Sequence, residues 1–128
     1  MREILFRGKS VYTDKWITGY YIGTGTIVKH GDEQYSVDPE TVGQFTGLTD
    51  KNGKKIFEGD VVVAELKSGT YQGFSWGKQK VVFWRGAFCL ESRTGEKTPL
   101  GSYSPAVLFK VIGNIHDNPE LLEVDDVR

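Results

Sequence analysis

The chain has 128 residues, which fits one domain of ordinary size and is too short for two. It contains 16 glycines, nearly twice the average share of about 7%. Seven Phe, six Tyr and three Trp argue against intrinsic disorder, because disordered chains are poor in large apolar side chains. The composition excludes a coiled coil, a disulfide scaffold and a membrane protein. Many glycines together with many aromatic residues predict short strands joined by tight turns.

The formal net charge is −1, whereas proteins that depend on binding nucleic-acid phosphates usually carry a clear excess of basic residues. Acidic residues gather in a short tail that starts at about Asp117. The single cysteine, Cys89, lies in an apolar strand pattern, so we expect a small buried side chain and a reducing compartment. We expect no signal peptide or membrane span, because no apolar run approaches the roughly 20 residues that a spanning helix needs. These features predict a single cytoplasmic domain over residues 1–128.

The first half of the chain shows the two-residue period of β-strands. Aromatic and β-branched residues alternate over Trp16–Ile22, which predicts a strand. Ile27–Val28 and Tyr35–Val37 flank a glycine-containing loop at His30–Asp32, which predicts a hairpin. Asp38–Thr41 has the Asp-Pro start of a turn or of one helical turn.

The clearest local pattern is Asn52-Gly53, which lies between Val42–Leu48 and Lys55–Phe57. Asn-Gly between two strand-like runs predicts a hairpin with a type I′ turn, because both residues tolerate positive φ. Gly59 then predicts a bend into the apolar strand Val61–Ala64.

The second half continues the same organisation. Lys80–Trp84 and Ala87–Leu90 predict another tight hairpin around Arg85-Gly86. Residues 93–105 are expected to form a long loop, and Phe109–Ile115 the last strand. Asn118-Pro119 predicts a short helix capped by the asparagine. Because no apolar period of helical spacing lasts for twelve residues, the sequence predicts an all-β single domain, a small barrel or sandwich with short helical turns.

Three segments carry a resemblance to a known family: Arg2–Arg7, the long block Val37–Val62, and Val111–Leu122. Together they resemble the YopX family of small phage and prophage proteins, over residues 2 to about 123. The resemblance implies a mostly β protein in the cytoplasm of a bacterial host, and it carries over no catalytic residue and no assigned activity. Residues Asp50–Asp60 match the family pattern, and the features that they share with it are a turn and a bend. Members vary most at Trp16–Tyr21 and Lys67–Gly77.

Candidate catalytic chemistry is sparse. His30 and His116 are the only histidines, and no Gly-x-Ser-x-Gly or comparable nucleophile motif accompanies them. Gly23-Thr24-Gly25 lacks the Lys-Ser/Thr end of a phosphate loop and predicts a turn. Five carboxylates crowd into 23 residues, but each has a turn-stabilising reason for its place: Asp38, Glu40, Asp50, Glu58 and Asp60. We therefore predict no catalytic residue, no metal site and no cofactor.

Aromatic and basic residues of the second half are the candidates for a binding site: Tyr71, Phe74, Trp76, Lys78, Lys80, Trp84 and Arg85. Such a mixture is typical of small β-barrels that stack nucleic-acid bases, but also of protein–protein interfaces. The same aromatics could instead be core residues. The sequence favours a non-enzymatic accessory protein that acts by binding a protein or by self-association. A nucleic-acid-binding module is the alternative, and an enzyme with a carboxylate site is third; no membrane partner is expected.

Overall fold

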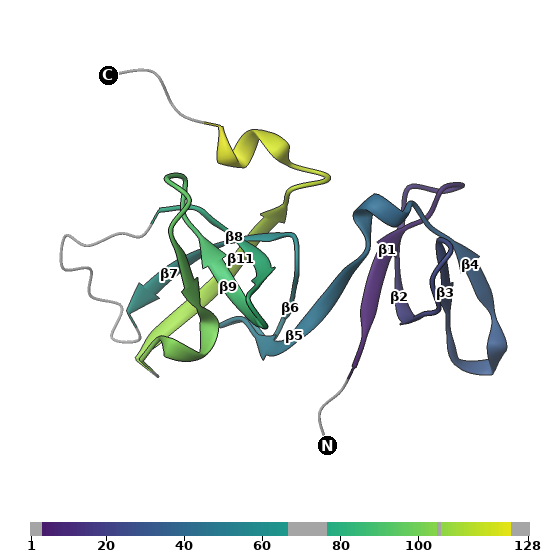
Figure 1. The fold of residues 1–128 in the computed structure, drawn as a ribbon, viewed down its shortest axis with the longest axis horizontal. Coiled ribbons are helices and arrows are strands. Elements are labelled where there is room, and N and C mark those ends of the chain that lie inside the picture. Colours follow the sequence, from purple (N-terminus) through teal and green to yellow (C-terminus); the bar gives the residue numbers. More distant parts are fainter. Residues whose placement is uncertain (1–3, 67–76, 105, 124–128) are drawn as a thin grey trace.

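The computed structural model describes residues 4–66, 77–104 and 106–123, and these form two antiparallel sheets (Figure 1). The all-β prediction is confirmed, since the helices of the described residues are single 3-10 turns. The six-stranded sheet has the order β4-β3-β2-β1-β5-β6, and the five-stranded sheet has the order β10-β9-β8-β7-β11. β1–β4 gather on one side of the molecule and β7–β11 on the other, and β5 runs between them (Figure 1).

The strands of the six-stranded sheet are β1 (Phe6–Lys9), β2 (Trp16–Tyr21), β3 (Thr26–Val28), β4 (Gln34–Ser36), β5 (Gly43–Thr49) and β6 (Lys55–Phe57). Those of the five-stranded sheet are β7 (Asp60–Leu66), β8 (Gln79–Trp84), β9 (Ala87–Glu91), β10 (Lys97–Pro99) and β11 (Val107–Asn114). The 3-10 turns are η1 (His30–Asp32), η2 (Pro39–Thr41), η3 (Leu100–Ser102) and η4 (Pro119–Leu122).

β1 lies in the middle of the six-stranded sheet, where it pairs with β2 on one side and β5 on the other. Strand periodicity alone does not predict β1, because its sequence, Phe-Arg-Gly-Lys, has only one apolar side chain. A bridge between Ser10 and Val37 connects the residue after β1 to the residue after β4. The first four strands therefore curl back toward one another.

The β5–β6 hairpin forms where predicted, but its turn is not of type I′. Among residues 50–54 only Gly53 has a positive φ, of 83°. The Asp50 carboxylate accepts hydrogen bonds from the N–H groups of Asn52 (2.8 Å) and Lys54 (2.9 Å), which holds a longer loop with one glycine in the left-handed region. The type I′ pattern occurs instead at the β8–β9 turn, where Arg85 and Gly86 have φ of 50° and 82°.

The segment after β9 corrects the predicted loop over residues 93–105, because it contains β10 and η3. β10 pairs with β9 over three residues, Lys-Thr-Pro, which have no large apolar side chain to indicate a strand in the sequence. The predicted helix at Asn118 is the single turn η4. The Asn118 side chain does not cap it and instead accepts a hydrogen bond from the N–H of Asn114 at 3.3 Å.

The main core lies on one face of the five-stranded sheet and receives one residue from the other sheet. Ile56 of β6 packs into the cluster formed by apolar side chains of β7, β8, β9, η3 and β11: Val62, Ala64, Val81, Leu90, Leu100 and Phe109. Gly43 permits the close approach of β5 to Glu58, the residue after β6, because a Cβ there would lie 2.5 Å from the carbonyl oxygen of Glu58. Within the described part of the chain, no helix is long and apolar enough to cross a membrane.

Candidate binding surface

The three aspartates considered for catalysis lie in different places, and each is engaged by its own surroundings. Asp38 caps η2 by accepting a hydrogen bond from the N–H of Glu40 at 3.0 Å. Asp50 holds the β5–β6 turn and also accepts from the N–H of Val111 at 3.0 Å. Burial opposes ionisation of Asp50, but the bonds from Val111, Lys54 and Asn52 outweigh it and lower its pKa.

Asp60 forms a buried ion pair with Arg7, which joins β7 to β1. Arg7 donates from Nη2 to Asp60 Oδ1 at 2.7 Å, and the N–H of Phe57 donates to Oδ2 at 2.8 Å. The guanidinium also lies over the rings of Trp16 and Phe57, at 4.6 and 4.8 Å from their centroids. Burial raises the pKa of Asp60 although Arg7 acts in the opposite direction. This arrangement connects the two sheets.

The two histidines lie in different parts of the structure and are not in contact. His30 is exposed in η1, whereas His116 is partly buried with its ring 5.9 Å from that of Trp16. Burial, and then the nearby charge of Arg7, lower the pKa of His116, which favours a neutral imidazole. Across residues 4–66, 77–104 and 106–123, no three His, Cys, Asp or Glu side chains are grouped so that they could hold a metal ion.

Asp117 makes a second connection between the sheets. Its carboxylate accepts from Lys9 Nζ at 2.6 Å and from Trp16 Nε1 at 2.8 Å. These hydrogen bonds, first from Lys9 and then from Trp16, lower the pKa of Asp117 to about 2. The stabilisation is therefore present above the ordinary aspartate value of 3.8 and is lost as the pH falls toward 2.

Asp117→Asn is expected to lower the free energy of unfolding at pH 7 by about 1 kcal/mol. The loss is smaller than the full pKa shift would give, because the Asp117 side chain is one-third exposed and water screens its interaction with Lys9. The variant should also lose less stability than the parent between pH 4 and pH 2, since it lacks the titrating group. Urea unfolding followed by tryptophan fluorescence at several pH values measures both effects. Asp32→Asn, the same substitution at an exposed position of η1, is the matched control and should leave the free energy of unfolding at pH 7 unchanged.

One face of the five-stranded sheet gathers basic, aromatic and acidic side chains. Lys80 and Trp84 lie on the same side of β8, and Lys80 is opposite Glu91, which in turn is opposite Lys97. Glu91 forms ion pairs with Lys80 (3.7 Å) and Lys97 (3.5 Å), and Lys97 Nζ lies 5.2 Å from the Trp84 ring centroid. We call this surface, formed by Lys80, Trp84, Glu91 and Lys97, the β8–β10 face.

The tip of the β8–β9 hairpin exposes two large aromatic side chains. Phe83 is 54% exposed and Trp84 is 41% exposed. Phe83 meets Phe88 edge-on with ring centroids 5.0 Å apart, and the Arg85 guanidinium lies 4.7 Å from the Trp84 ring centroid. Strands β8 and β9 pair along five residues, so a continuous β-ladder extends to this tip and fixes its backbone.

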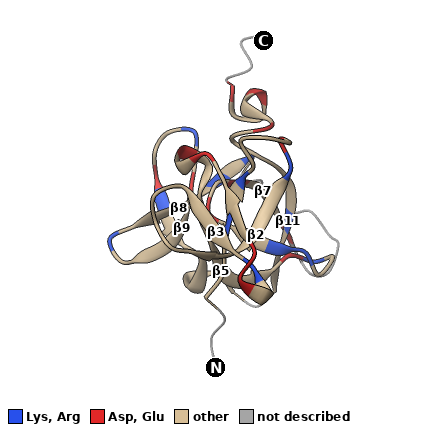
Figure 2. Ribbon diagram, turned by 90° about the vertical axis from the view of Figure 1, so that its right-hand side faces the viewer, with Lys and Arg blue, Asp and Glu red and all other residues tan. Residues whose placement is uncertain are grey.

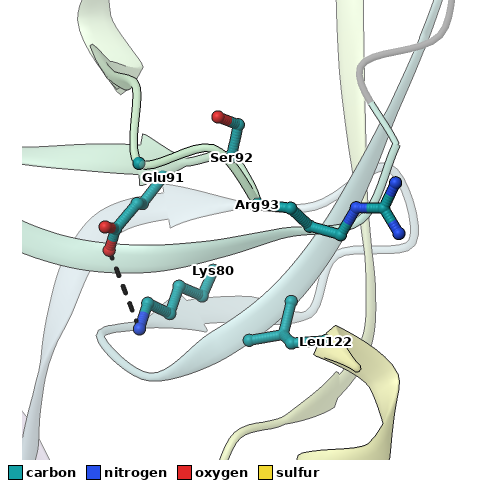
Figure 3. A pocket seen from close by; sticks show the side chains of 6 residues that line it. Lys80, Glu91, Ser92, Arg93 and Leu122 are labelled. Carbon is teal, nitrogen blue, oxygen red and sulfur yellow. Dashed lines mark ion pairs between the residues drawn. The ribbon is translucent and has the colours of Figure 1, made fainter. Parts of the chain in front are cut away.

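A small pocket lies at the opposite end of the β8–β10 face (Figure 3). Its volume is about 200 Å³ and it is lined by Lys80, Glu91, Ser92, Arg93, Gly95 and Leu122. Leu122 comes from η4 and supplies an apolar side, and the Arg93 side chain extends away from the Lys80–Glu91 ion pair (Figure 3). We call it the Arg93 pocket.

The structure brings together only some of the predicted binding residues. Lys80 and Trp84 share one face, Arg85 covers the Trp84 ring, and Lys78 is exposed just before β8. Trp84 is exposed, so the alternative prediction that this aromatic residue belongs to the core is wrong, and Arg85 is exposed beside it. The sequence did not point to Phe83, Arg93, Lys97 or Leu122. The remaining candidates, Tyr71, Phe74 and Trp76, lie outside the described residues.

Comparison with known proteins supports the fold and the family. The chain is similar to protein EF1440 from Enterococcus faecalis, with a TM-score of 0.56 and 23% identity over 96% of this chain and 100% of that one. It is also similar to protein yopX from Bacillus subtilis, with a TM-score of 0.54 and 20% identity over the same shares. No curated protein matches. The family model described as YopX protein matches residues 5–123, and the chain therefore belongs to the YopX family.

Proposed function

We propose that this protein is a non-enzymatic accessory protein, encoded by a phage or prophage, that acts by binding a protein through the β8–β10 face and the adjoining hairpin tip. The observation that carries the proposal is the exposure of two consecutive aromatic residues, Phe83 and Trp84, on the two faces of a paired hairpin at its tip. Tryptophan and arginine are the residues that most often dominate the binding energy of protein interfaces. Trp84 and Arg85 together supply both at one tip.

Charge supports a partner with acidic groups. Residues 77–104 carry five basic and two acidic side chains, although the whole chain has a net charge of −1. Figure 2 shows basic positions around β8 and β9 and acidic positions on the segment that leads to the C-terminus. Basic groups at the rim of an aromatic patch guide association and exclude partners of the wrong charge.

The same basic character keeps nucleic-acid binding as the second candidate. Stacking a base on Trp84 would require a free face of its ring. Arg85 and Lys97 already lie against that ring, at 4.7 and 5.2 Å from its centroid. Because a base would compete with these cations, the geometry favours a protein partner.

The test is an affinity capture from bacterial host lysate with three tagged proteins: the parent chain, Phe83→Ser/Trp84→Ser, and Tyr12→Ser as control. Tyr12 is 83% exposed in the β1–β2 loop, away from the proposed surface. A protein retained by the parent and by the control, and lost with the double variant, is the expected result. Identical recovery with all three would contradict the proposal.

In parallel, labelled single-stranded DNA is titrated with the protein at low salt to test nucleic-acid binding, the second candidate function. We expect no change in anisotropy. Binding that weakens steeply with salt and disappears in Lys80→Ala/Trp84→Ala would replace the protein partner with a nucleic acid.

A further inference from the structure

We infer that the β8–β10 face binds a second copy of this chain, with Trp84 of each copy seated in the Arg93 pocket of the other. This inference rests on the proposed function and names its partner. It follows from the size of the pocket, from the position of the pocket relative to Trp84, and from the distribution of charge.

The pocket has the size of one aromatic side chain. Its volume of about 200 Å³ is below the roughly 300–1,000 Å³ of sites for small molecules and cofactors. A cavity of about 150 Å³ is sufficient for benzene. Leu122 and the aliphatic part of the Arg93 side chain offer apolar contacts to the part of the Trp84 indole ring that Arg85 and Lys97 leave exposed.

Trp84 and the pocket lie on the same face of the sheet, which permits a closed dimer. Lys80 lines the pocket and is four residues from Trp84 on the same side of β8, a distance of about 13 Å along the strand. A two-fold axis that lies parallel to this face, midway between the two points and perpendicular to the line that joins them, places each Trp84 on the pocket of the other copy. Because the same patch is used twice, the association closes at two chains.

The charges at the two ends of the face are complementary. Arg85 and Lys97 accompany Trp84, whereas Glu120 and Glu123 are exposed in and after η4, next to Leu122 of the pocket. Residues 111–123 contain three acidic side chains and neither Lys nor Arg. Within the described residues of one chain, no ion pair joins Arg85 to either glutamate. The two-fold arrangement brings Arg85 of one copy to these glutamates of the other.

The experiment measures molar mass by size-exclusion chromatography with light scattering over a series of loading concentrations. The parent chain is expected to approach twice the 14.3 kDa of one chain as the concentration rises. Arg85→Glu, Glu120→Lys/Glu123→Lys and Trp84→Ser should each remain at the mass of one chain. Tyr12→Ser should behave like the parent, and thermal unfolding establishes that every variant is folded.

Mixing provides the decisive measurement. When Arg85→Glu is combined with Glu120→Lys/Glu123→Lys, both contacts of the mixed dimer again join opposite charges, so the doubled mass should return. A parent chain that stays at one chain's mass at every concentration overturns the inference, as does a dimer that Arg85→Glu leaves intact. If the chain is monomeric while capture of another protein still depends on Phe83 and Trp84, the inference fails and the proposed function stands.

Discussion

Asp60→Ala is expected to lower the free energy of unfolding by about 3–5 kcal/mol, the usual effect of removing one partner from a buried ion pair. The Asp60 side chain is 1% exposed and the Arg7 side chain is 10% exposed. The substitution leaves the Arg7 charge buried without its carboxylate and removes the acceptor for the N–H of Phe57. Urea unfolding at pH 7 measures the loss.

Two further variants test whether the loss of stability in Asp60→Ala comes from leaving a buried charge unpaired rather than from losing any ion pair. Lys51→Ala removes the exposed pair between Lys51 and Glu65, which are joined at 2.6 Å, and should change stability by no more than about 1 kcal/mol. Arg7→Met/Asp60→Asn removes both charges while keeping an acceptor for Phe57. It should be more stable than Asp60→Ala. A double variant that is no more stable than Asp60→Ala would show that the unpaired charge is not the cause.

Ile56→Ala is expected to cost about 2–5 kcal/mol, because it leaves a cavity in the core that both sheets share. Ile56 is fully buried, and although β6 belongs to the six-stranded sheet, its side chain packs among apolar residues of the five-stranded one. We expect a single calorimetric transition that moves to lower temperature as a whole.

Ile22→Ala is the matched control, since Ile22 is 59% exposed and its truncation should change stability by less than about 0.5 kcal/mol. If Ile56→Ala instead splits the transition into two, with one part unchanged, the sheets would be independent units. A small effect on a single transition would show that the core closes around the missing side chain.

The two connections between the sheets also explain what holds the candidate surface in place. The Arg7–Asp60 pair fixes the start of β7, and the Asp117 contacts with Lys9 and Trp16 fix the chain just before η4. η4 in turn supplies Leu122 to the Arg93 pocket. The geometry of the pocket therefore depends on residues of β1 and β2, which lie in the other sheet.

Several local features could be predicted because neighbouring residues specify them. Alternation predicted β2, an apolar run predicted β7, and the hairpin pattern around Arg85-Gly86 predicted β8; Gly59, with a φ of 93°, makes the bend expected before β7. The β5–β6 hairpin was predicted from Asn52-Gly53, but its turn type was not, because the Asp50 carboxylate holds a longer loop. β10 was missed because its three residues, Lys-Thr-Pro, include no large apolar side chain and end in a proline, which is unusual in strands.

The candidate site could be predicted only in part. Lys80, Trp84 and Arg85 are close in sequence, and a hairpin with period two places Lys80 and Trp84 on the same side of the strand. Lys97 reaches the same face through β10, and Leu122 through η4, by pairing and packing between distant segments. No local pattern in the sequence indicates either contact.

The sequence by itself determined the fold class, the family and the positions of most turns, because backbone preference and the two-residue period act over a few neighbouring residues. Only the tertiary structure decided that Arg7 meets Asp60, that Ile56 fills the core of the other sheet, and that Trp84 and the Arg93 pocket share one face. These contacts join residues far apart in the chain, and their energies come from desolvation and packing, which exist only once the sheets have come together. The glycine excess has both kinds of cause. Local backbone conformation with positive φ explains Gly53, Gly59 and Gly86, whereas Gly43 is required because the backbone of Glu58 approaches it.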